Sequence, residues 1–298
     1  MSFLDSLPPL LKDPPPAFAF EVSEAGIAFS PTGRGAQARF HELEPGVVSV
    51  SPVRDNVQRP EIFAAHVAAL VPASGNKKRR TAALILPDHS ARLQVLDFDS
   101  FPANAEEQRA LIRFRVKKSV PFDVASAAVS YHVQPVADNG KIEVVAAVAA
   151  LEIVARYEAA FRGAGYQPGL VTTSSLAALN LVPSNNLAVL AKLSGRVLSV
   201  LVVGAAALRL VRTVELDDIS SDDILAVLFP TLAYIEDQMH GKADRLLLCG
   251  FGPRSREWAA EWRHELGIPV EGVQSKAGEP GPHNAGLLGY LEAAGALS

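Results

Sequence analysis

The stretch LAVLAKLSGRVLSVLVVGAAALRLVRTVEL, residues 187–216, decides the fold. It divides into three apolar runs, Leu187–Ser194, Arg196–Val203 and Ala206–Leu216, with glycines at or beside the breaks between them. Short runs rich in Val and Leu and bounded by turn residues are typical of β-strands. The stretch therefore predicts a three-stranded meander.

A second meander is predicted near the start of the chain. Its strands are Ala17–Glu24, Gly26–Thr32 and Ala38–Glu42, and Phe18, Phe20 and Val22 alternate with smaller or polar residues in the first of them. Each meander is followed by alternating predicted helices and strands, among them a helix at Ala105–Val116, a strand at Gly169–Thr173 and a helix at Ser221–His240 that Pro230 should kink or divide. A repeated strand–strand–strand–helix–strand–helix–strand unit indicates an α/β fold with two similar halves, the arrangement of a fold that clamps a nucleotide.

Composition limits the classes of function. The chain has 298 residues, of which 49% are hydrophobic and 20% charged, enough for two modest domains with a large core. A net charge of −4 argues against nucleic acid as a partner recognised by charge. The single cysteine, Cys249, excludes a disulfide within the chain and is interpreted as a buried apolar residue. The seven histidines show no metal-ligand spacing, so no metal is expected.

The location of the protein is predicted to be cytoplasmic. Residues 1–16 are a proline-rich leader without the pattern of a signal peptide, interpreted either as a flexible tail or as a docking arm. The uncharged run Val197–Leu208 is shorter than the roughly 20 residues that a membrane helix needs, so no span is expected. The basic run 77–80 is either a solvated loop or a weak attractor of anionic lipid. Membrane association would require a partner or a surface patch.

A series of short motifs carries a family resemblance. Leu84-Ile85-Leu86-Pro87 resembles an "ALPG" strand, Ser119-Val120-Pro121-Phe122-Asp123 an "IPFPL" signature, and Ser130-Tyr131-His132-Val133 a "DYQV" strand. In this order the motifs resemble those of the PilM family of type IV pilus assembly proteins. The chain is more distantly similar to the cytoplasmic part of GspL and to FtsA.

The resemblance implies an actin-like (ribonuclease H-like) duplicated α/β fold, with two lobes built on mixed five-stranded sheets and a small inserted α+β subdomain. The implied bounds are a leader at 1–16, a first lobe at 17–182 with the insert at about 88–142, a second lobe at 183–282, and a C-terminal helix at 283–298 that returns to the first lobe.

The first phosphate loop of the family has changed chemistry. Active relatives carry D-I-G-S-S-S-V-K, in which glycine allows close backbone approach and aspartate serves the metal. The matching residues here are Glu21–Ala28, where Glu21 replaces the aspartate, Ser23 the glycine and Ala28 the lysine. Glu24 would add a negative charge that repels phosphate.

The second phosphate loop is altered as well. Leu190-Ala191-Lys192 stands where the family has D-I-G, and the segment Leu187–Val214 contains no Asp or Glu. Compared with the family that the chain resembles, the altered loops therefore imply a pseudo-ATPase with no catalytic residues, no metal and no cofactor. The alternative is that the protein binds ATP and magnesium as cofactors. Helices that the family carries between Glu215 and Ser221 are expected to be missing.

A third loop is partly retained. Gly250, Phe251 and Gly252 resemble the family's adenosine loop, and they are interpreted either as a structural turn or as a vestigial nucleotide contact. Trp258 and Trp262, four residues apart on a predicted helix, either pack in the core or form a partner-binding face.

These inferences predict a non-catalytic cytoplasmic scaffold or adaptor of a type IV pilus, or of a related secretion platform, at the inner membrane. Its expected partner is the cytoplasmic tail of a PilN-like single-span membrane protein, with pilus motor or platform proteins as further partners. Val120, Pro121 and Phe122 are candidates for the groove that receives this tail, or are purely structural. The alternative is an ATP-binding or ATP-hydrolysing switch of the same assembly, and an adaptor for a different membrane complex also stays open.

Overall fold

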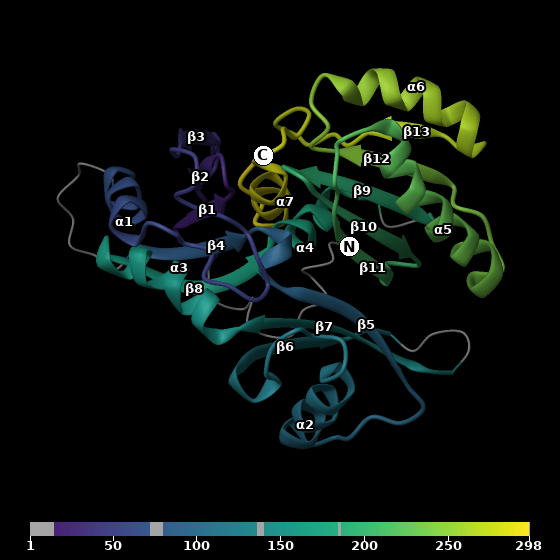
Figure 1. Cartoon of the computed structure of the whole chain (residues 1–298), viewed down its shortest axis with the longest axis horizontal. Coiled ribbons are helices and arrows are strands. Elements are labelled where there is room, and N and C mark those ends of the chain that lie inside the picture. The colour runs from purple at the N-terminus through teal and green to yellow at the C-terminus, as the bar shows by residue number, and fades with distance from the viewer. Residues whose placement is uncertain (1–14, 72–79, 136–139, 184–185, 298) are drawn as a thin grey trace.

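The computed structural model describes residues 15–71, 80–135, 140–183 and 186–297 (Figure 1). Most of the proline-rich leader, residues 1–14, and residues 77–79 of the basic run lie outside this part. The described strands form two five-stranded sheets and one three-stranded sheet.

The first sheet has the strand order β3-β2-β1-β4-β8. Its strands are β1 (Phe18–Val22), β2 (Gly26–Pro31), β3 (Arg39–Glu42), β4 (Arg80–Leu86) and β8 (Tyr166–Thr173). The first three strands are antiparallel, whereas β1, β4 and β8 run parallel. Because side chains alternate along a strand, β1 sends Phe20 to one face of the sheet and Ala19 to the other. Phe20 packs with Phe63 and Phe161 of helices α1 (Pro60–Ala69) and α3 (Leu151–Gly163).

The second sheet repeats this order as β11-β10-β9-β12-β13. Its strands are β9 (Ala188–Ser194), β10 (Val197–Gly204), β11 (Ala207–Glu215), β12 (Arg245–Cys249) and β13 (Val270–Gly272). Helices α5 (Ser221–Met239) and α6 (Arg254–Leu266) cover one face. Trp258 and Trp262 of α6 stack in this core with ring centroids 5.3 Å apart, which supports the packing interpretation. Pro230 is predicted to kink or divide this helix because it lacks an N–H, but α5 is one continuous helix through it, so the predicted division is wrong.

The third sheet, order β5-β7-β6, is inserted between β4 and β8. It consists of β5 (Arg92–Phe98), β6 (Ala127–Val133) and β7 (Ile142–Ala150) and is covered by helix α2 (Ala105–Val116) (Figure 1). The side chain of Asn104 caps α2 by accepting a hydrogen bond from the Glu106 amide at 2.8 Å. Two mixed five-stranded sheets with a small inserted α+β unit are the fold class that the sequence predicted, and it is confirmed.

Helix α7 (Ala285–Ala293) packs against the short helix α4 (Ser174–Ala178) between the two large sheets. A Cβ at Gly289 would lie 2.2 Å from the carbonyl oxygen of Ala177, so only glycine permits this approach. Leu287 of α7 contacts the core of the first sheet, and Leu288 contacts that of the second. The last helix therefore packs against both halves of the molecule.

Candidate functional site

A cluster of buried charged side chains lies where the two large sheets face each other. Glu21 comes from β1, Asp88 from the 3-10 turn η3 (Asp88–Ser90) that follows β4, and Lys192 from β9. Their exposed fractions are 4%, 3% and 2%. Strands β1 and β9 occupy equivalent positions in the two sheets, so Glu21 and Lys192 face each other from corresponding strands.

Asp88 accepts hydrogen bonds from both halves of the molecule. The ammonium of Lys192 and the hydroxyl of Ser199 each lie 3.0 Å from its Oδ2 atom, and both residues belong to the second sheet. The backbone amide of Ser175, which belongs to the first half, donates to its Oδ1 atom at 2.6 Å. The Asp88 carboxylate is therefore a direct link between the lobes.

Burial and the neighbouring carboxylates act in opposite directions on the pKa of Lys192. Burial lowers the pKa of its ammonium, but attraction to Asp88 and Glu21 outweighs that effect and raises the pKa above its ordinary value. A buried lysine without a carboxylate partner is costly, so the pair with Asp88 is needed for the charge to be tolerated.

Glu21 uses both carboxylate oxygens inside the protein. Oε1 accepts a hydrogen bond from the Ser174 hydroxyl, and Oε2 accepts from the Leu287 amide at 2.7 Å, in the first turn of α7. A carboxylate at the N-terminus of a helix complements the helix dipole. Burial raises the pKa of Glu21, with attraction to Lys192 opposing the shift.

The first altered loop satisfies its own polar groups. The Ser23 hydroxyl donates to the Gly26 carbonyl at 3.0 Å, closing the turn between β1 and β2. Glu24 is exposed, and its carboxylate accepts a hydrogen bond from the Val50 amide at 2.7 Å.

The side chains of the charged cluster do not form a site for the magnesium ion that an ATPase of this fold uses. Magnesium requires carboxylate or water oxygens in an octahedral arrangement. Here the ammonium of Lys192 and two other hydrogen-bond donors already surround Asp88, and Glu21 is engaged with Ser174 and α7. Among the described residues there is no group of three or more His, Cys, Asp or Glu that could hold a metal ion.

Two residues of the third loop, Gly250 and Phe251, have structural roles. Gly250 has φ +80°, and a Cβ there would lie 2.2 Å from the backbone oxygen of Leu193. Phe251 is 5% exposed and packs edge-on against Trp258. Gly252 has φ +58° with open space around its Cα. Gly250 is therefore required by the chain's own packing, whereas a nucleotide contact at these residues stays a prediction.

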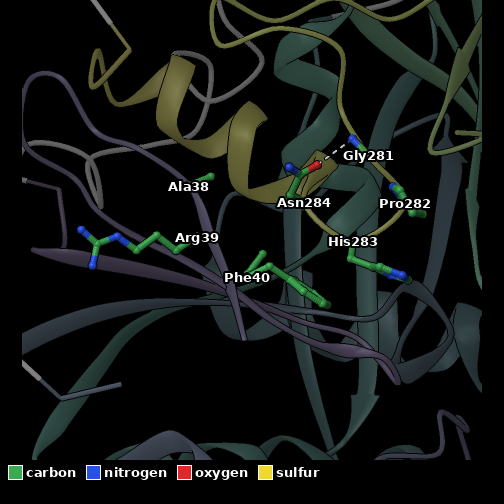
Figure 2. Close-up of a pocket in the computed structure, with 8 residues that line it drawn as sticks. Ala38, Arg39, Phe40, Gly281, Pro282, His283 and Asn284 are labelled. Carbon is green, nitrogen blue, oxygen red and sulfur yellow. Dashed lines mark hydrogen bonds between the residues drawn. The ribbon is translucent and has the colours of Figure 1, made fainter. Parts of the chain in front are cut away.

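A hollow of about 200 Å³ lies between strands β2 and β3 and the loop that precedes α7 (Figure 2). Its lining residues are Ala28, Ala38, Arg39, Phe40, Gly281, Pro282, His283 and Asn284. The rings of Phe40 and His283 stack with centroids 5.5 Å apart, and Arg39 points away from them (Figure 2). Burial, followed by the nearby charge of Lys192, lowers the pKa of His283. The hollow is smaller than the roughly 300–1,000 Å³ of ordinary ligand pockets.

The three candidate partner-binding residues lie at the junction of the first half and the insert. Val120 is buried in the core of the insert, Pro121 is exposed, and Phe122 packs against the cores of both parts. Phe122 therefore has a structural role, while partner binding by the three residues stays a prediction.

A second link joins the insert to the second lobe. The side-chain amide of Gln134 donates to the Leu208 carbonyl at 2.8 Å and accepts from the Leu208 amide at 2.7 Å, as a neighbouring strand would. Arg209 forms an ion pair with Glu143 of β7 at 2.7 Å. The lobes are thus connected through the insert as well as through Asp88.

Sequence reasoning identified Glu21 and Lys192 as altered loop residues but missed Asp88, Ser199 and Gln134. A signal for Asp88 was present. Lys192 interrupts an apolar strand, and a buried lysine needs a carboxylate, while no Asp or Glu stands near it in its own meander. The structure supplies this partner from the other half, where Asp88 follows the buried strand β4 after Pro87. Gln134 carries no comparable signal.

Two five-stranded sheets of equivalent strand order, joined by buried charged side chains and with a small inserted subdomain, are the arrangement of an actin-like fold. In agreement, the chain is similar to a chain of the "PilM-PilN type IV pilus biogenesis complex", with TM-score 0.72 and 17% identity over 93% of this chain and 98% of that one. A protein of actin-like ATPase fold and unknown function from Bacteroides thetaiotaomicron gives TM-score 0.57 and 12% identity, covering 96% and 99% of the two chains.

The cytoplasmic domain of EpsL, an inner-membrane component of the type II secretion system of Vibrio cholerae, gives TM-score 0.49 and 13% identity, covering 94% of each chain. No protein-family model matches the chain, and no curated protein matches it by sequence. The predicted resemblance to PilM is confirmed for the fold. In the part of the chain that the structure describes, no helix is both long and apolar enough to cross a bilayer.

Proposed function

We propose that this protein is a non-catalytic actin-like scaffold whose lobes are held together by its own buried charges instead of a nucleotide. The observation that carries the proposal is the contact between Lys192 and Asp88, which places an ammonium between the two halves and joins them. In this role the contact region is a structural joint, and binding surfaces elsewhere perform the function.

The platform that it serves is a cytoplasmic assembly at the inner membrane, of a type IV pilus or a related secretion system. Support comes from the likeness to a chain of the PilM–PilN complex, which extends over nearly the whole of both chains. The partner would be the short cytoplasmic tail of a PilN-like single-span protein, received at the junction of the first lobe and the insert. Main-chain pairing and apolar pockets would supply the affinity.

A pull-down from membranes of the source organism, with the full chain as bait, tests this role. We expect recovery of a single-span protein with a short cytoplasmic tail, and weaker recovery with Pro121→Asp, which alters an exposed position at the junction. The matched control is Phe229→Ala, an exposed position on α5 of the second lobe. Capture of only soluble proteins, or equal capture by Pro121→Asp, would contradict the proposed partner or its site.

The second candidate function is an ATP-gated switch of the same assembly. Gly252 favours it, because its positive φ and open surroundings at a strand-to-helix turn are not explained by packing. A thermal-shift assay with MgATP separates the two candidates, since a ligand at 100 times its Kd stabilises the folded state by about 2.7 kcal/mol.

A further inference from the structure

Helix α2 presents an aromatic side chain to the outside of the molecule. Phe114 is 76% exposed, the largest exposed fraction among the large hydrophobic residues that the structure describes. Ala110 lies one turn before it on the helix, and Lys117 and Lys118 follow in the turn just beyond the end of α2, where both are exposed. We call these four residues the α2 patch.

The opposite face of α2 fixes this orientation. Ile112 and Val116 are fully buried in the core of the insert. The guanidinium of Arg113 donates to the carbonyl oxygens of Val124 and Ala127. Figure 1 shows α2 on the outer side of the three-stranded sheet, at the end of the molecule away from α6. The α2 patch is therefore a fixed, outward-facing surface.

The charge around the α2 patch is opposite in sign to that of the whole chain. Residues 105–118 contain five basic and two acidic side chains, whereas the whole chain carries a net charge of −4. Among the described residues, none forms an ion pair with Arg109, Lys117 or Lys118. These cations are therefore available to an external anion.

We propose that the α2 patch docks on the surface of an anionic phospholipid bilayer, with Phe114 in the interfacial layer and Lys117 and Lys118 at the headgroup phosphates. Aromatic side chains are favoured at the level of the headgroups. Basic residues are attracted by the negative potential of an anionic leaflet. A bilayer surface also accepts a single protruding side chain, whereas a protein partner must supply a fitted pocket for it.

This contact goes beyond the proposed function. It requires only the α2 patch and lipid charge, and it would act beside a membrane partner by orienting the scaffold on the bilayer.

Vesicle flotation of the full chain tests the proposal. One set of vesicles contains phosphatidylcholine alone and the other contains phosphatidylcholine with phosphatidylglycerol. We expect binding to the anionic vesicles only, weakened by salt. Each lysine near an anionic surface contributes roughly fivefold in affinity, so Lys117→Ala/Lys118→Ala should lower binding by roughly 25-fold. Phe114→Ala should lower it by roughly tenfold.

The matched control is Phe229→Ala. Phe229 is 48% exposed on α5, a helix without a basic residue, and its removal should leave vesicle binding unchanged. Absence of binding to anionic vesicles, or equal binding by wild type and the α2 variants, would overturn the proposal. Loss of an acidic protein partner in the same variants, without vesicle binding, would overturn it in favour of a protein ligand. Unchanged melting temperatures show that each variant is folded.

Discussion

The Nζ atom of Lys192 lies 3.0 Å from Oδ2 of Asp88, and this contact joins β9 of the second sheet to the turn after β4 of the first. The two side chains are 2% and 1% exposed. Because each partner belongs to a different lobe, removing one of them leaves the other charge buried without a partner, or exposes it, at the contact between the lobes. In the proposed scaffold this pair holds the two lobes together, as a bound nucleotide does in an active ATPase of this fold.

We expect Asp88→Asn to lower the free energy of unfolding by about 3–5 kcal/mol, because it leaves the Lys192 ammonium buried without its closest carboxylate. Urea denaturation measures this loss. The double variant Asp88→Leu/Lys192→Met should recover much of it, since apolar replacement of both partners removes the uncompensated charge.

The matched control for this prediction is the surface pair Arg162–Glu158, whose atoms lie 2.9 Å apart with side chains 59% and 23% exposed. Glu158→Gln should cost only about 0.5 kcal/mol or less. Asp88→Asn as stable as this control would show that the buried pair does not hold the lobes.

Glu21→Gln should change how stability depends on pH. Because burial raises the pKa of Glu21 above 4.5, the folded state retains its proton more strongly than the unfolded state. The contribution of Glu21 to the free energy of unfolding is fully present below the ordinary pKa. It is lost as the pH rises through the raised pKa of the folded state. Each unit of upward shift corresponds to about 1.4 kcal/mol.

The oxygen of a glutamine can accept from the Leu287 amide while its NH2 group donates to the Ser174 hydroxyl, so both contacts are kept without a charge and this variant should be at least as stable as wild type at pH 7. Its free energy of unfolding should also fall less steeply between pH 4.5 and pH 7. Denaturation across this range, with the exposed Glu265→Gln as control, measures the difference. Identical pH profiles for Glu21→Gln and wild type would refute the assignment.

Substitution by alanine should lower stability by different amounts at the two glycines of the third loop. At Gly250 the new Cβ would meet the backbone of Leu193 at 2.2 Å, so Gly250→Ala should cost about 3 kcal/mol or more. At Gly252 only the positive φ is unfavourable, and Gly252→Ala should cost about 1–2 kcal/mol. Thermal denaturation compares the two, and equal losses would contradict the packing role of Gly250.

Gln134→Ala should loosen the insert from the second lobe. It leaves the buried amide and carbonyl of Leu208 without partners, at a cost of about 2–4 kcal/mol in total. Hydrogen exchange should accelerate at the Leu208 amide. Gln94→Ala, which removes an exposed side-chain contact to Ser119, should have little effect on either quantity. Unchanged exchange at Leu208 in Gln134→Ala would mean that this link is dispensable.

Most of the fold could be predicted from the sequence because its signals are local. The three strands of the second meander lie within one residue of their predicted ends at Ala188–Ser194, Val197–Gly204 and Ala207–Glu215. Helix α2 begins after Asn104, a strong N-cap residue, and has its predicted bounds. The strand β8 begins at Tyr166 rather than at the predicted Gly169. Its first residues pair with β4 across a bulge, and no local sequence pattern indicates that bulge.

The candidate site was predicted only in part, because its contacts cross the two halves. The altered loops identified Glu21 and Lys192 as positions of changed chemistry. Their partners depend on how the lobes pack: Asp88 is 104 residues from Lys192, and Leu287 is 266 residues from Glu21. Periodicity and spacing describe neighbours along the chain, so contacts of this separation follow only from the assembled fold.

Titration calorimetry of the full chain with MgATP tests the central claim most directly. If the Lys192–Asp88 pair has replaced the nucleotide as the joint between the lobes, wild type will show no saturable heat of binding up to millimolar concentrations of MgATP. Saturable binding of micromolar affinity, lost on substitution of Gly252, would contradict the claim and establish the cleft as a nucleotide site.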